Sequence, residues 1–180
     1  RNIQIYSLND NRLVENIEFK DPELSGKYLR GGVGFIPFDL DSMYVTNRDR
    51  KIFLTGKDSI HARYEVDFEK DNPVISFRNE SPLIQFNDSL FGMAQFKPFP
   101  FYAEEFLKSS VFAIFNKNSR KAIDANITLP QEVYSGNCWV PGLLRSSYTY
   151  NHETQQVIFS FPADHNLYSF DPIQNSLDII

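Results

Sequence analysis

The chain has 180 residues, of which 42% are hydrophobic and 15% aromatic, and its formal net charge is −5. This length and composition suit one folded domain with an ordinary core and exclude a disordered chain. The acidic balance and the scattered Lys and Arg residues offer no basic surface to a phosphate backbone, so nucleic acid is not an expected partner. The abundance of Phe and Tyr favours pleated sheets over helices, and the expected fold class is all-β.

The first expected elements are two strands at residues 3–8 and 13–19, which form a hairpin around the polar turn at 9–12. Asn and Asp tolerate left-handed backbone in such a turn. The following loop, residues 21–32, is rich in Pro and Gly and leads into Gly34. It lacks the Lys-Ser/Thr pair of a phosphate-binding loop, so we interpret it as a tight crossing between sheets.

The next segment predicts a complete four-stranded meander. Its strands are expected at residues 33–38, 42–46, 51–55 and 59–68. The chain from 69 to 110 is less regular. In it we expect short strands at 74–78 and 83–86, an aromatic stretch at 96–102 that Pro98 and Pro100 exclude from a central strand, and a short helix within 102–110.

The last third of the chain again shows strands and polar turns around one long loop at residues 129–147. Strands are expected at 112–116, 122–127, 148–150, 158–161, 167–171 and 177–180. In this part, Asp164 occupies the same turn as Asp49 does in the meander. An Asp at such a position accepts backbone N–H bonds and fixes the corner, which is a structural role.

A short strand that ends on Asn, Asp or Gly recurs four times, at intervals of roughly 47 to 60 residues, and each copy precedes a turn and a second strand. The copies begin at Ile5, Ile52, Phe112 and Leu167. A period of roughly 40 to 50 residues is typical of a propeller blade, and loop insertions lengthen it. The sequence therefore predicts a partial β-propeller of about three and a half four-stranded antiparallel blades. Residues 1–180 would form one domain, and the resemblance described below implies that it is a segment of a longer propeller.

Residues that could hold a metal or act as a nucleophile are isolated. His61, His152 and His165 lie on or beside polar turns and have no second ligand at metal-binding spacing. Cys138 is the single cysteine, which excludes an intrachain disulfide, and next to Trp139 it is typical of a small buried hydrophobe. We therefore predict no metal, no cofactor and no catalytic residue.

Carboxylates leave one alternative open, because propeller glycosidases act through paired Asp and Glu side chains across a central cleft. The candidates are Asp39, Asp41, Glu104, Glu105 and Glu132. The sequence alone brings no two of them together, and solvated surface carboxylates are the favoured interpretation.

An aromatic cluster on the long loop and the strand behind it is the best candidate for ligand binding. It consists of Tyr134, Trp139, Arg145, Tyr148 and Tyr150. Tyr, Trp and Arg dominate recognition hot spots, and flat aromatic rings also stack on sugars. The alternative is that these residues close the blade ends by packing, which is the ordinary role of abundant aromatic residues.

Two segments, residues 39–68 and 155–180, resemble an uncharacterised family of bacterial cell-envelope β-propeller lipoproteins. The run Ile158-Phe-Ser-Phe-Pro-Ala-Asp-His-Asn-Leu-Tyr-Ser-Phe-Asp171 carries most of this likeness. The resemblance implies a propeller of about six blades, a periplasmic or cell-surface location with a possible lipid anchor, and no established reaction. The chain is too short for a full ring of that kind, and no active-site residue carries over.

The expected function is a non-catalytic binding or scaffold propeller of the bacterial cell envelope, which recognises a protein or a glycan through its blade-connecting loops. Membrane attachment is expected only through an upstream lipid anchor, since no apolar run reaches the roughly 18 residues of a membrane helix. The alternative is a carbohydrate-active hydrolase or lyase with carboxylates in the propeller channel. That alternative depends on analogy between folds.

Overall fold

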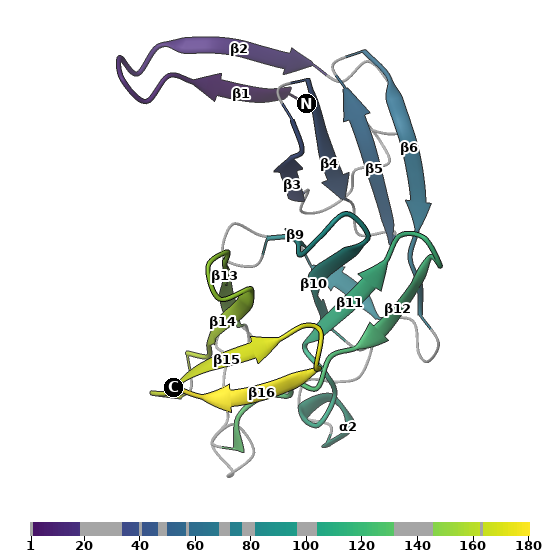
Figure 1. Ribbon diagram of the computed structural model, residues 1–180, viewed down its shortest axis with the longest axis vertical. Coiled ribbons are helices and arrows are strands. Elements are labelled where there is room, and N and C mark those ends of the chain that lie inside the picture. Colours follow the sequence, from purple (N-terminus) through teal and green to yellow (C-terminus); the bar gives the residue numbers. More distant parts are fainter. Residues whose placement is uncertain are drawn as a thin grey trace.

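The computed structural model describes most of the chain, which Figure 1 shows from the N-terminus in purple to the C-terminus in yellow. The described residues are 2–18, 34–39, 41–46, 50–56, 58–68, 73–76, 82–96, 104–131, 146–162 and 164–180. They form several antiparallel sheets and one short helix, α2 (Glu104–Leu107). The expected all-β class is confirmed, and so is the short helix within residues 102–110.

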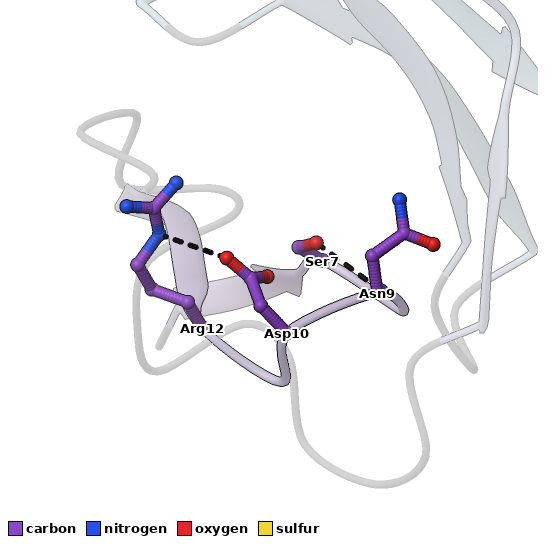
Figure 2. Close-up of polar contacts among 4 residues, drawn as sticks. All are labelled: Ser7, Asn9, Asp10 and Arg12. Atoms are coloured by element: carbon purple, nitrogen blue, oxygen red, sulfur yellow. Dashed lines mark hydrogen bonds and ion pairs between the residues drawn. The ribbon is translucent and has the colours of Figure 1, made fainter.

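The N-terminal hairpin pairs β1 (Asn2–Tyr6) with β2 (Leu13–Glu18). The backbone N–H of Ser7 closes the turn with a 2.9 Å hydrogen bond to the carbonyl of Arg12. Figure 2 shows the side chains of this turn: Ser7 Oγ accepts from the backbone N–H of Asn9 at 3.3 Å, and Arg12 Nε lies 3.5 Å from Asp10 Oδ2. Local polar contacts therefore define the turn, as its Asn and Asp content predicts.

The predicted four-stranded meander is confirmed, and we call it the first sheet. It consists of β3 (Gly34–Pro37), β4 (Ser42–Thr46), β5 (Lys51–Gly56) and β6 (Ile60–Glu65), hydrogen-bonded in that order. The strand predicted at 59–68 is interrupted at Val66. Burial of Val66 and Phe68 in one core cluster carries the chain across to the next sheet, so β7 (Asp67–Phe68) pairs in parallel with β12 there.

The central sheet contains β8 (Val74–Ser76), β9 (Ile84–Gln85), β10 (Leu90–Phe96), β11 (Phe112–Asn116) and β12 (Lys121–Asp124). Its order is β7-β12-β11-β10-β8, with β9 beside β10. No strand is predicted at the position of β10, because Gly92 and Ala94 have low β-propensity. The strand forms nevertheless because tertiary packing buries it on both faces.

The last sheet is a meander of four antiparallel strands at the C-terminal end of the chain. It consists of β13 (Ser147–Asn151), β14 (Gln156–Ser160), β15 (Leu167–Asp171) and β16 (Ser176–Ile179), in that order. The recurring strand of the sequence repeat forms β5, β11 and β15. Each of these three is followed by the antiparallel strand β6, β12 or β16 of the same sheet, so these copies occupy equivalent places.

Three hairpins of the central and last sheets share one turn geometry. An Asn or Asp at the end of the first strand accepts two backbone N–H bonds at 2.8 to 3.3 Å, and the residue four positions later has positive φ. The pairs are Asn116 with Arg120, Asn151 with Gln155, and Asp171 with Asn175. Short polar side chains thus set the register of these hairpins.

Each sheet packs face to face against the next one along the chain. Ile17 of the hairpin joins Val45 and Phe53 of the first sheet in one cluster. A second cluster joins the first sheet to the central sheet, and a third, around Phe112 and Phe159, joins the central sheet to the last. In Figure 1 the sheets follow one another in chain order along an arc, with β3 and β13 on its inner side and β6 and β16 on its outer side.

Candidate functional site

The residues of the predicted aromatic cluster divide into two groups. Tyr148 and Tyr150 lie on β13, the inner strand of the last sheet. Tyr134, Trp139 and Arg145 fall in residues 132–145, outside the described part of the chain. The geometry of the site therefore starts from the two tyrosines.

Tyr148 is a core residue, with 6% of its surface exposed. Its ring packs edge-on against Phe112 at 5.1 Å between centroids and tilted against Phe159 at 5.2 Å. Its hydroxyl donates to the carbonyl of Pro82 at 2.6 Å and accepts from the backbone N–H of Ala94 at 3.0 Å. Complete burial raises the pKa of this hydroxyl far above its ordinary value. Tyr148 therefore packs in the core, which is the alternative to ligand binding that the sequence left open.

Tyr150 points to a different environment, a pocket of about 520 Å³ between three sheets. Its walls come from β3 of the first sheet, from β9 and the turn after it in the central sheet, and from β13 of the last sheet. The described lining residues are Ile36, Pro37, Pro82, Leu83, Ile84, Gln85, Phe86, Asn87, Asp88, Thr149, Tyr150 and His152. A volume of this size lies in the range of small-ligand sites, roughly 300 to 1,000 Å³.

The pocket has an apolar floor and a more polar rim. We call the buried apolar lining residues Leu83 and Ile84 the floor, and the exposed polar lining residues Asn87, Asp88 and His152 the rim. Apolar surface at the base and a few polar groups around it is the usual composition of a ligand-binding pocket, since burial supplies affinity and the polar groups fix orientation.

Aromatic rings form one side of the pocket. The ring of Tyr150 lies 5.4 Å from that of Phe86, tilted by 57°, and 4.8 Å from that of His152 in an edge-on arrangement. Partial burial raises the pKa of the Tyr150 hydroxyl above its ordinary value. The three rings come from two sheets and give the pocket a π-surface.

The carboxylate at the rim is held on an ordered turn. Asn87 Oδ1 accepts from the backbone N–H groups of Ser89 and Leu90, both at 2.9 Å, and so fixes the loop that carries Asp88. The backbone N–H of Lys117 donates to Ser89 O at 2.9 Å and ties this loop to the β11–β12 turn. The side chain of Asn87 therefore stabilises the turn on which Asp88 lies.

Tyr44 lies behind this turn, fully buried in the first sheet. Burial, with a smaller effect from the nearby charge of Asp88, raises the pKa of its hydroxyl. The same hydroxyl accepts a long, 3.5 Å hydrogen bond from Lys117 Nζ. Asp88, Tyr44 and Lys117 therefore belong to one electrostatic neighbourhood at the junction of two sheets.

The carboxylates singled out in the sequence have other positions. Asp39 Oδ1 accepts from the backbone N–H groups of Asp41 at 2.8 Å and Ser42 at 2.7 Å, and these bonds, that of Asp41 first, lower the pKa of Asp39. Glu104 pairs with Lys108 on the exposed face of α2. Glu105 is exposed beside it, and Glu132 lies outside the described residues.

Two further observations concern the described residues alone. Among them, no group of three His, Cys, Asp or Glu side chains is close enough to hold a metal ion. The one helix they contain, α2, is far shorter than a bilayer crossing requires. Cys138 lies outside the described part of the chain.

Sequence reasoning did not identify Phe86 and Asp88 as site residues. Both fall in the stretch that looked irregular, and the contacts that make them part of a pocket come from β3 and β13, which are distant in sequence. The local signal was the polar turn Asn87-Asp88-Ser89 between two apolar runs, which by itself predicts a turn and nothing more.

Comparison with known proteins gives a likeness in structure. No protein-family model matches the chain, and no curated protein matches its sequence. Among solved structures, the chain is similar to the crystal structure of a member of the DUF4221 family from Bacteroides vulgatus, with a TM-score of 0.76 and 17% sequence identity. The match covers 99% of this chain and 50% of that one, so the chain spans about half the length of this neighbour. At this identity the likeness concerns the fold, and the neighbour belongs to an uncharacterised domain family.

Proposed function

We propose that the chain is a segment of a β-propeller and that it acts as a non-catalytic binding module, which recognises a protein or a glycan partner. The recognition site in this proposal is the pocket between β3, β9 and β13. Tyr134, Trp139 and Arg145, which the sequence predicts as binding residues and which lie outside the described part of the chain, complete the proposal. The observation that carries the proposal is the convergence of three consecutive sheets on one aromatic-sided pocket.

The propeller part of the proposal is supported by the way the sheets follow one another. Consecutive sheets share a core cluster across their faces, and each of the two four-stranded meanders begins on the inner side of the arc in Figure 1. Radial repetition of four-stranded antiparallel sheets is the definition of a propeller, and its central channel is lined by the inner strands. The pocket is lined by β3 and β13, which are inner strands of this kind.

Binding is favoured over catalysis by the composition of the lining. Hydrolysis of a glycosidic bond requires two carboxyl groups about 5 to 10 Å apart. The described lining contributes one carboxylate, Asp88. Apolar floor, aromatic side and single carboxylate together suit reversible recognition.

The cellular location in this proposal is the bacterial envelope, either periplasm or cell surface, with attachment through an upstream lipid anchor. It follows from the resemblance of residues 39–68 and 155–180 to envelope propeller lipoproteins. Fractionation of cells that express the full-length gene, with detection of the protein by antibody, tests the location independently of the binding site. Recovery in the cytoplasmic fraction would contradict it.

The binding proposal is tested by displaying the purified chain on a glycan array and on a peptide array, beside Tyr150→Ala and Trp139→Ala variants. Tyr6→Ala is the matched control, because Tyr6 is 52% exposed on the distant hairpin β1–β2. We expect at least one ligand whose signal falls tenfold or more in Tyr150→Ala and stays unchanged in Tyr6→Ala. The assignment of this pocket would be overturned if every ligand bound Tyr150→Ala and Tyr6→Ala equally well, or if no ligand bound on either array. Release of reducing sugar from a bound glycan would contradict the absence of catalysis.

A further inference from the structure

Among the described residues that line the pocket, the permanent charge is negative. The described lining contains the carboxylate of Asp88 and neither Lys nor Arg. Among the residues that the structure describes, Asp88 forms no ion pair, although the ammonium group of Lys117 lies close enough to contact Tyr44. An exposed carboxylate beside low-dielectric walls focuses a negative potential into the pocket, which attracts cations and repels anions. The net charge of −5 acts in the same direction over longer distances.

The depth of the pocket suits a ligand with an apolar stem. Between the buried floor at Leu83 and Ile84 and the exposed rim at Asp88, the walls include half-buried Ile36, Pro82 and Phe86. Lys and Arg side chains carry a stem of three or four methylene groups that packs on apolar surface while the charged end reaches a polar partner.

The aromatic side adds a second attraction for a cation. The ring centroid of Tyr150 lies 5.4 Å from that of Phe86 and 4.8 Å from that of His152. A Lys ammonium or Arg guanidinium over the face of an aromatic ring is attracted by the ring's negative π-face, and the attraction is stronger where water is excluded. The carboxylate of Asp88 and these aromatic rings belong to the lining of the same pocket.

The surface next to the pocket favours a polypeptide as the source of this group. Phe35 and Phe38 flank the lining residues Ile36 and Pro37, and they are 48% and 45% exposed. Phe38 is held edge-on against Tyr44 at 5.4 Å, so its ring is oriented while still open to solvent. Aromatic side chains are enriched in protein–protein interfaces relative to the rest of the surface.

We propose that the pocket binds the basic side chain, Lys or Arg, of a protein partner, with Asp88 as the counter-ion and Tyr150 as the aromatic contact. This inference depends on the proposed function and narrows its partner class. In the complex, Phe35 and Phe38 pack on the residues that flank the inserted side chain. The fixed turn of Asp88 lowers the entropic cost of the ion pair, because Asn87 already orders the loop before binding.

The probes that test this inference are four capped tripeptides, acetyl-Gly-X-Gly-amide, in which X is Lys, Arg, norleucine or Glu. Binding is followed by chemical-shift changes in the ¹⁵N-labelled chain, with D-glucosamine and D-glucose as sugar probes. We expect the Lys and Arg peptides to bind, the norleucine and Glu peptides to bind at least tenfold more weakly, and the affinity to fall as salt is raised.

The matched variants are Asp88→Asn, which keeps the shape and removes the charge, and Asp178→Asn at an exposed site on β16. We expect about tenfold weaker binding of the Lys peptide in the first and no change in the second, with thermal unfolding showing that both fold. Equal binding of the norleucine peptide, or no effect of Asp88→Asn, would overturn the inference. The inference would also be overturned if the chain preferred one of the sugars to the peptides and Tyr150→Ala abolished that preference. In that case the proposed binding function would stand. If none of the peptides or sugars binds at the pocket of the wild-type chain, both this inference and the proposed binding function fail.

Discussion

The hydroxyl of Tyr148 hydrogen-bonds at 2.6 Å to the backbone carbonyl of Pro82, a residue 66 positions earlier in the chain. The same hydroxyl accepts a bond from the backbone N–H of Ala94 on β10. Pro82 is part of the pocket wall, and Tyr148 lies beside Tyr150 on β13. One buried hydroxyl therefore holds two walls of the candidate site at a fixed separation.

Removing this hydroxyl should lower stability. In Tyr148→Phe the ring still packs on Phe112, but the buried N–H of Ala94 loses its partner, so we expect a loss of about 1 to 3 kcal/mol in the free energy of unfolding. Urea unfolding followed by circular dichroism measures it. The control is Tyr150→Phe, whose hydroxyl makes no hydrogen bond to the described residues and should cost less than about 0.5 kcal/mol. Equal losses in both variants would contradict this role of Tyr148.

Gly92 permits a close approach of two rings to β10. A Cβ at this position would lie 2.4 Å from Phe112 Cζ and 2.5 Å from Phe86 Cζ. Since both rings would have to move, we expect Gly92→Ala to lose about 1 to 3 kcal/mol and to disturb ligand binding through Phe86. Thermal unfolding compares it with Gly56→Ala, where the nearest atom belongs to the exposed side chain of His61 at 3.0 Å. A smaller loss in Gly92→Ala than in Gly56→Ala would show that the rings adapt freely.

The left-handed turn residues offer a stabilising change. Gln155 has φ of 57°, a conformation that costs a residue with a Cβ about 1 kcal/mol relative to glycine. Gln155→Gly should therefore raise the free energy of unfolding by up to about 1 kcal/mol, reduced by the larger chain entropy of glycine. The neighbouring change Gln156→Gly, within β14, should lower it. Chemical denaturation of the two variants decides, and destabilisation of the same size in both would refute the turn assignment.

Asp39 should make stability depend on acid pH. Its pKa is lowered in the folded protein, chiefly by the N–H of Asp41, so its contribution is complete above the unfolded pKa of about 3.9 and is lost as pH falls through the folded pKa. The difference in unfolding free energy between the wild-type chain and Asp39→Ala should be constant from pH 7 to about pH 5 and shrink below about pH 4. Asp41→Ala serves as the control. A difference that persists undiminished at pH 3 would argue against these hydrogen bonds.

The part of the fold that could be predicted from sequence is the part that local chemistry determines. Asn116, Asn151 and Asp171 stabilise their turns through atoms two or three residues away, so the hairpins they form were visible as strand, polar turn and strand. The first sheet was predicted strand by strand for the same reason. Its last strand was predicted to run three residues too far at its C-terminal end, because the break at Val66 depends on the core of the neighbouring sheet.

The candidate site was less accessible to such reasoning. Tyr148 and Tyr150 look alike in the sequence and lie on the same face of β13. The ring of Phe112 packs on Tyr148, whereas Tyr150 lies beside Phe86 at the pocket and is only partly buried against the same core. Asp88 carries no motif, since its position at the rim depends on strands that begin more than fifty residues away on either side. The strand β10 was missed because Gly92 is required by rings that the sequence does not place beside it.

The parallel pairing of β7 with β12 also affects how the chain can assemble during its synthesis. Asp67 leaves the ribosome well before Lys121, its partner in the register, so β7 remains an open edge while the residues between them are translated. The first sheet can close as a meander in this interval, but its link to the central sheet waits for β12. An amino-acid substitution that slows formation of the β11–β12 hairpin should therefore prolong exposure of Phe68 and promote aggregation of nascent chains.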